Sequence, residues 1–465
     1  MIDGGATLAR RLERYRDATR SPATSHGTPR CDDLATRLAD ALDGEIVRGE
    51  EGVIVRCEAP TRVIPLDRVR LSTLPGQPGA GIPLVCLDTE TTGLATAAGT
   101  LAWLIGLGWW EDDRFRQVQL LLPDHGEERA LLAALEAMIP PNAWLVTYNG
   151  RAFDWPLLVA RYRLARRAAP VHAGHLDLLP IVRRLFRHRM PDARLRTAEA
   201  ELLGLHRVGD VEGWEIPGRY LRFLRGAPAA DLAEVVRHND QDVRSLGRLL
   251  AHLEAGLGDP ARRSEAPAGD LAGLARSLSR EHRLGEALEC LDAATDRVVI
   301  EPPRPSAGPG RPHRDGGPGE EPWWSPRRPA DFGGRPGHAP SQVGPAPSAP
   351  VDAPWTAERI AIDRAHLLRR LGRHADAADA WSALAAGSGR SAVLAAIELA
   401  KLNEHRLGDR PAAFLAVQRG LGTIERRRRL GRPEPALEAD LLRRAERLRR
   451  RMARGVRRAS PVAAT

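Results

Sequence analysis

The feature that most constrains the fold is a series of apolar runs separated by charged turns. The first, residues 82–88, is continuously apolar and ends in an acid, which predicts a buried strand with a carboxylate at its tip. Residues 101–110 and 115–122 predict the next two strands, and residues 144–148 predict a fourth. A helix-like segment at residues 127–138 precedes the fourth strand. This order predicts an α/β domain with a mixed sheet.

Two further helices are predicted beyond the fourth strand, at residues 155–167 and 231–253. The second carries an apolar stripe typical of a helix that packs on a sheet. Before residue 81 the pattern is weaker. Residues 6–18 predict an amphipathic helix, and residues 44–74 predict short strands separated by turns. We therefore expect residues 1–80 to form a small lead-in that carries no chemistry.

Composition divides the rest of the chain. Residues 301–354 contain 15 prolines and 9 glycines, too many for a packed core, so a disordered linker is predicted there. Helix-pair patterns lie on both sides of it, at residues 268–300 and 355–458. Small residues recur at spacings near the ~34-residue tetratricopeptide period. These segments therefore resemble degenerate tetratricopeptide (TPR) repeats.

The positive charge is concentrated near the C-terminus. The formal net charge is +9, and residues 425–458 hold 14 arginines against five acids, which accounts for the whole excess. Such a segment can bind phosphates through its guanidinium groups. A solvated arginine-rich helix explains it equally well.

Several protein classes are disfavoured by the sequence. No apolar run approaches the ~20 residues of a membrane-spanning helix, and the first residues lack the apolar segment of a secretory signal. The four cysteines are scattered and form no CxxC pair, so neither a disulfide framework nor a structural zinc site is expected. A reducing cytoplasm is the predicted location.

Candidate chemistry begins with Asp88 and Glu90 in the segment LDTETTGL. On an extended strand, residues i and i+2 face the same way. Two carboxylates held side by side repel each other unless a cation neutralises them, and hard oxygen ligands suit Mg²⁺ or Mn²⁺. Taken alone, such a pair is more often two solvated turn acids.

Two further acids lie at the edges of other elements. Asp154, in YNGRAFDWPLL, stands where a loop enters a helix, and a helix N-cap is its alternative role. His238 and Asp242, in HNDQDV, are four residues apart and share a helical face. The alternative there is a weak surface pair, although Asp242 adjoins the apolar stripe.

Together these segments resemble the DEDD (DnaQ-like) 3′–5′ exonuclease superfamily. The likeness covers about residues 82–253 and implies an RNase H-like mixed sheet flanked by helices over residues 81–258. The YprB-like subgroup, which adds TPR-type helices, is the most similar. Five positions match the family motifs in order: Asp88, Glu90, Asp154, His238 and Asp242.

The resemblance implies hydrolysis of phosphodiester bonds by two divalent ions, Mg²⁺ or Mn²⁺. The four acids would hold the ions, and His238 would be the general base. Thr89 and Asn149 are the predicted substrate contacts, although Asn149 suits a turn equally well. Arg207 would either touch phosphate or lie solvated on the surface. The prediction requires the four carboxyl groups to converge, with none buried against a guanidinium.

The leading hypothesis is therefore a cytoplasmic, metal-dependent 3′–5′ exonuclease acting on DNA or RNA, with single-stranded ends as the expected substrate and a protein partner for the TPR-like helices. The alternative is a catalytically weak RNase H-like domain that binds nucleic acid or acts as a scaffold. Endonucleolytic cleavage would use the same residues. The sequence does not distinguish DNA from RNA, because that choice depends on cleft geometry.

Overall fold

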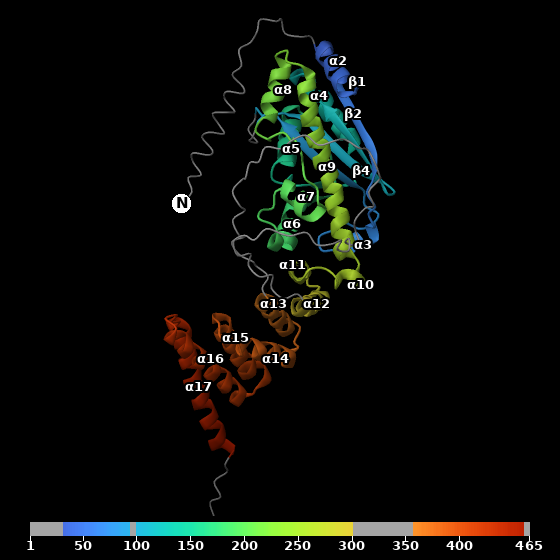
Figure 1. Ribbon diagram of the computed structural model, residues 1–465. Coiled ribbons are helices and arrows are strands. Elements are labelled where there is room, and N and C mark those ends of the chain that lie inside the picture. Colours follow the sequence, from blue (N-terminus) through green and yellow to red (C-terminus); the bar gives the residue numbers. More distant parts are fainter. Residues whose placement is uncertain (1–30, 94–98, 301–356, 460–465) are drawn as a thin grey trace, which may run out of the picture.

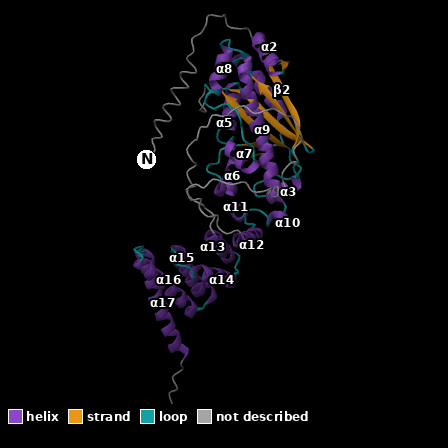
Figure 2. Ribbon diagram, viewed as in Figure 1, coloured by secondary structure: helices purple, strands orange, loops and turns teal. Residues whose placement is uncertain are grey.

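The computed structural model describes residues 31–93, 99–300 and 357–459. The helix predicted at residues 6–18 and the linker predicted at 301–354 lie outside these ranges. The structure has an upper part built around a sheet and a lower part built of helices (Figures 1 and 2). No helix among the described residues is long and apolar enough to cross a bilayer.

The upper part contains a seven-stranded mixed sheet in the order β1-β2-β5-β4-β3-β6-β7. Neighbours are antiparallel from β1 to β3, whereas β6 and β7 run parallel to β3. The strands are β1 (Glu45–Gly49), β2 (Gly52–Val63), β3 (Leu84–Thr91), β4 (Ala102–Glu111), β5 (Arg114–Leu121), β6 (Trp144–Thr147) and β7 (Gly174–Asp177).

This sheet confirms the predicted α/β class but corrects one boundary. Strands β1 and β2 pair with each other and then, through β2, with β5. Residues 44–63 are therefore part of the same sheet as β3 and not a separate lead-in. The pairing partner of β2 lies more than fifty residues further along the chain, and a local pattern does not reveal such a contact.

Helices cover both faces of the sheet (Figure 2). In the upper part they are α2 (Cys31–Leu42), α3 (Arg68–Thr73), α4 (Glu128–Met138), α5 (Asp154–Leu164), α6 (Leu178–Phe186), α7 (Leu195–Leu203), α8 (Ile216–Leu224), α9 (Ala233–Leu253) and α10 (Pro260–Arg263). The predicted helix at 231–253 begins at Ala233, after a short 3₁₀ turn.

The side chains of β3 alternate between two cores, as strand geometry requires. Leu84 and Cys86 belong to the core that contains Val243 of α9. Val85 and Leu87 belong to the second core, with residues of α4 and α5. The next residues on the α9 side of β3 are therefore Asp88 and Glu90, so the alternation that builds the core also directs both acids to α9.

The lower part is a run of antiparallel helices in which each packs against the next. They are α11 (Ala268–Arg280), α12 (Leu284–Ile300), α13 (Ala357–Arg370), α14 (His374–Ala385), α15 (Arg390–Leu402), α16 (Arg410–Arg429) and α17 (Pro435–Ala459). Helix α11 packs on α6 at Gly273, where an added Cβ would lie 2.6 Å from the Arg184 carbonyl oxygen. One apolar core therefore continues from the sheet into these helices.

Much of the arginine charge in α16 and α17 is neutralised within the fold. Arg447 and Arg451 of α17 both pair with the buried Glu404. Arg428 pairs with Glu425 and Glu438. Part of the predicted basic tail therefore braces the last helices against one another.

Candidate active site

The first motif lies within β3 and not at its tip, because the strand continues to Thr91. Its pairing with β6 nevertheless stops at Cys86, so the following residues project beyond the end of the parallel part of the sheet. Glu90 is 9 % exposed. The Asn239 amide of α9 donates a hydrogen bond of 2.9 Å to Asp88 Oδ2. Asp88 is thus held against α9, and Glu90 extends from the same face of β3.

Two glycines of β4 allow α9 to approach this closely. Gly106 pairs with Asp88 across the sheet, and a Cβ added there would lie 2.2 Å from Asn239 Oδ1 and 2.7 Å from a Val243 methyl group. A Cβ at Gly108 would lie 2.8 Å from Val243. Any larger residue at these positions would separate α9 from the acids of β3.

Asp154 begins α5, and the preceding Phe153 is the N-cap residue, so the alternative role of Asp154 as an N-cap is not observed. Thr89, whose side chain points to the other side of β3, donates a hydrogen bond of 2.5 Å to Asp154 Oδ1. Thr89 therefore holds a carboxylate. Its predicted contact with substrate stays a prediction.

The loop before Asp154 is fixed by Asp177 at the end of β7. Its Oδ1 accepts hydrogen bonds from the backbone N–H of Asn149 at 2.7 Å and of Leu179 at 3.1 Å, and its Oδ2 accepts one from Arg151 N–H at 3.3 Å. Asn149 has a φ of 70°, a conformation that asparagine tolerates better than most residues. These contacts give Asn149 a turn role and leave its predicted substrate contact a prediction.

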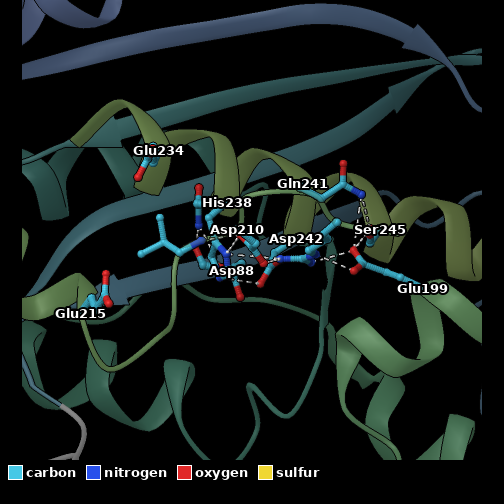
Figure 3. A network of polar contacts seen from close by, with 12 residues as sticks. Asp88, Glu199, Asp210, Glu215, Glu234, His238, Gln241, Asp242 and Ser245 are labelled. Atoms are coloured by element: carbon cyan, nitrogen blue, oxygen red, sulfur yellow. Dashed lines mark hydrogen bonds and ion pairs between the residues drawn. The ribbon is translucent and has the colours of Figure 1, made fainter. Parts of the chain in front are cut away.

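The third motif lies on α9. His238 Nδ1 is 2.6 Å from Asp210 Oδ1, and His238 Nε2 is 3.7 Å from Asp242 Oδ2. A carboxylate only accepts hydrogen bonds, so this contact assigns the proton to Nδ1. Asp210, which the sequence analysis missed, therefore orients the predicted base (Figure 3).

Arg207 contradicts the requirement that no carboxylate be buried against a guanidinium. Its side chain is only 8 % exposed, and its Nη2 donates to Asp242 Oδ1. It also pairs with Glu199 and Asp210. Arg207 is thus neither a solvated surface arginine nor free for phosphate. Asp242 is paired with it, and the predicted role of Asp242 as a metal ligand stays a prediction.

The carboxylates are close enough to affect one another electrostatically. Burial, reinforced by the charges of Asp242, Glu90 and Asp154, raises the pKa of Asp88 well above its ordinary value. Burial and the charges of Asp242, Asp154 and Asp210 raise the pKa of Glu90, against the opposing charge of Arg207, and burial raises the pKa of Asp154. For Asp242, burial raises the pKa despite the opposing charges of His238 and Arg207. The predicted acids therefore converge, and their proximity is unfavourable when all are charged.

Carboxylate oxygens are suitable donors for a hard cation, although the side chains do not form a complete coordination site. Across residues 31–93, 99–300 and 357–459, no three histidine, cysteine, aspartate or glutamate side chains are arranged to enclose a metal ion. Asp88, Glu90 and Asp154 are buried or half-buried carboxylates, and carboxylate oxygens are the donors that Mg²⁺ and Mn²⁺ prefer. They fit an ion by chemistry, whereas Asp242 is already paired.

Comparison with known proteins agrees with this geometry. Residues 85–254 match the model of the RNase H superfamily. This part of the chain is therefore RNase H-like. The chain is also 40% identical over 172 residues to the "Uncharacterized protein YprB" of Bacillus subtilis (strain 168), an alignment that covers 37% of this chain and 41% of that protein. The chain therefore spans about two fifths of the length of this curated relative.

Four residues of the RNase H-like domain were not predicted in their observed roles: Glu199, Arg207, Asp210 and Asn239. Glu199 is fully buried in α7 beside Ala198 and Leu202, and a lone acid inside an apolar stripe is a signal that it needs a partner. Asp210 lies in an irregular loop, where no periodicity marks it.

Proposed function

We propose that the RNase H-like domain is a metal-dependent 3′–5′ exonuclease that hydrolyses phosphodiester bonds of DNA or RNA. The observation that carries the proposal is the convergence of the buried Glu90 and the half-buried Asp88 and Asp154 as mutually repelling carboxylates. Such an arrangement is costly in an apoprotein and becomes favourable when a cation binds. The DEDD pattern of the same residues supports the exonuclease subtype.

A pocket beside these acids offers room for the end of a strand. It measures about 200 Å³ and includes Glu90 and Asp154 in its lining, together with Phe153 and Ile216. Phe153 is 53% exposed, and an exposed aromatic ring can stack on a base without regard to sequence. We propose that the terminal nucleotide lies here, with its phosphate toward the carboxylates.

His238 is the proposed general base. Its Nδ1–H is engaged by Asp210, so Nε2 remains to accept a proton from the attacking water. A divalent ion held by Asp88, Glu90 and Asp154 would polarise the phosphodiester and lower the pKa of bound water. The two-ion form of the mechanism, with Asp242 as a further ligand, would additionally require Arg207 to release Asp242.

The test uses 5′-labelled linear and internally labelled circular single strands of DNA and RNA with Mg²⁺ or Mn²⁺. We expect stepwise shortening of linear substrates from the 3′ end, no cleavage of circles, and loss of at least a hundredfold in rate for Asp88→Ala. Asp240→Ala is the matched control, because Asp240 pairs with Arg244 on α9. Equal rates for Asp88→Ala and wild type would refute the proposal, and cut circles would favour an endonuclease.

A second candidate function is favoured by the Arg207–Asp242 pair. A domain in which Arg207 stays paired with Asp242, a predicted metal ligand, could bind nucleic acid without cleaving it. Thermal unfolding distinguishes the two. Mn²⁺ should raise the Tm of the wild type but not of Asp88→Asn if the site holds an ion, whereas a purely binding module would show no such shift.

The helices α11 to α17 extend the proposal beyond the catalytic part. We propose that they are TPR-like and bind a protein partner, because consecutive small residues such as Ala395 and Ala396 are buried where α15 packs. The net positive charge of residues 425–458 would guide nucleic acid toward the site. A cytoplasmic location remains a prediction from the free cysteines.

A further inference from the structure

The guanidinium of Arg207 is held in place by the buried carboxylate of Glu199. Its Nε lies 2.6 Å from Glu199 Oε2 and its Nη2 lies 2.7 Å from Glu199 Oε1, a two-pronged contact. Glu199 is itself 0% exposed and accepts a hydrogen bond from Ser245 of α9. Planar paired contacts of this kind hold an arginine in one orientation.

The other edges of Arg207 face the third motif. Nη1 is 3.1 Å from Asp210 Oδ2 and 3.3 Å from His238 Nδ1, and Nη2 also donates to Asp242 Oδ1. The guanidinium thus joins α7, the loop that follows it and α9. Moving it away would leave Glu199 charged and buried without its counter-ion, a change that costs several kcal/mol in other proteins.

This permanent positive charge occupies the side of the site where Asp242 lies. Arginine keeps its charge at any pH compatible with folding, so Asp242 faces this charge, which it shares with Glu199 and Asp210, whether or not metal is present. A divalent ion coordinated by Asp242 would have to approach the fixed guanidinium against charge repulsion. Asp88, Glu90 and Asp154 have no such fixed neighbour in direct ion-pair contact among the described residues.

We propose that Arg207 takes the place of one of the two expected cations, so that the site binds a single divalent ion through Asp88, Glu90 and Asp154 while Asp242 stays paired with the arginine. This inference rests on the proposed metal dependence. It departs from the two-ion mechanism implied by the sequence resemblance, and it makes Arg207 a positioning residue whose effect is read in ion stoichiometry.

The experiment counts Mn²⁺ bound per chain of the full-length protein by equilibrium dialysis, with electron paramagnetic resonance of the bound ion. We expect one ion with an isolated-ion spectrum. The variant Glu199→Gln/Arg207→Gln removes the buried cation together with its buried partner, which limits the damage to the fold. In this variant Asp242 is released, and we expect two ions whose spins couple, because paired ions in such sites lie ~4 Å apart.

Arg196→Gln is the matched control, since Arg196 is an exposed arginine of α7, and it should leave one ion. Two ions in the wild type would overturn the inference and leave the proposed nuclease activity standing. One ion in both the wild type and a folded Glu199→Gln/Arg207→Gln variant would also overturn it. No bound ion in the wild type would overturn both the inference and the metal-dependent function.

Discussion

The four carboxylates of the site, Asp88, Glu90, Asp154 and Asp242, are stabilised in two different ways. On the β3 and α5 side, Asp88 accepts a hydrogen bond from Asn239 and Asp154 accepts one from Thr89, both neutral groups. On the α9 side, Asp242 faces the guanidinium of Arg207. Burial raises the pKa of carboxylates on both sides, but only the α9 side contains a full opposing charge.

The difference indicates where an external cation would stabilise the protein most. A neutral donor forms a hydrogen bond with one carboxylate oxygen but does not cancel the negative charge. The carboxylates on the β3 and α5 side therefore depend on a cation from solution for charge neutralisation. The α9 side is supported by a buried arginine and is a structural element as much as a catalytic one. Substitutions on the two sides should therefore change stability in opposite directions.

The largest expected change in stability follows substitution on the α9 side. Arg207→Ala leaves Glu199 buried and unpaired, which we expect to lower the free energy of unfolding by about 3–5 kcal/mol. Urea unfolding in the presence of a chelator measures it. Glu199→Gln/Arg207→Gln should lose much less, which a double-mutant cycle would express as a large coupling energy. Wild-type stability in Arg207→Ala would mean that the ion pairs contribute little.

A second prediction concerns the contact that holds the two sides together. Gly106→Ala places a methyl group against Asn239 and Val243, so α9 must shift away from β4, at a cost of about 1–3 kcal/mol. Mn²⁺ affinity should also fall, because Asn239 would leave Asp88. Gly49→Ala is the control, since an added Cβ in β1 meets nothing within 4 Å. Equal stability of both variants would show that α9 adapts without loss.

Much of this fold was accessible from the sequence, because its strands and helices carry strong local patterns. The acids of β3 were placed on one face by strand alternation alone, and α9 by its stripe of Val243 and Leu246. The attachment of β1 and β2 to β5 was not accessible, since it depends on a contact between distant segments. The same holds for the network of charges around α9.

Arg207 shows this limit most clearly. Nothing in LLGLHRVGDVEG separates a buried arginine from a solvated one. Its burial results from Glu199, eight residues earlier, and from Asp242, thirty-five residues later. A motif identifies which residue types are present, whereas their counter-ions are decided by tertiary packing.

A third prediction separates loop support from general stability. Asp177→Ala removes an N-cap and the acceptor for Asn149 and Arg151 N–H, with an expected loss of about 1–2 kcal/mol. Asp259→Ala removes the N-cap of α10, away from the site, at similar cost. Only Asp177→Ala should reduce the rise in Tm produced by Mn²⁺, because only this loop positions Asp154. Equal reductions in both variants would contradict a specific role for Asp177.

The smallest expected effect has the opposite sign. The raised pKa of Asp88 means that the folded state holds its proton more tightly than the unfolded chain does. Stability from this group is therefore present at low pH and lost as pH rises above the ordinary aspartate pKa. In chelator, Asp88→Asn should match wild type near pH 4 and exceed it by about 1 kcal/mol near pH 8, because asparagine carries no charge and still accepts the Asn239 hydrogen bond. If Asp88→Asn were instead less stable than wild type at pH 8, the β3 and α5 side would already be neutralised from within, and its dependence on an external cation would be refuted.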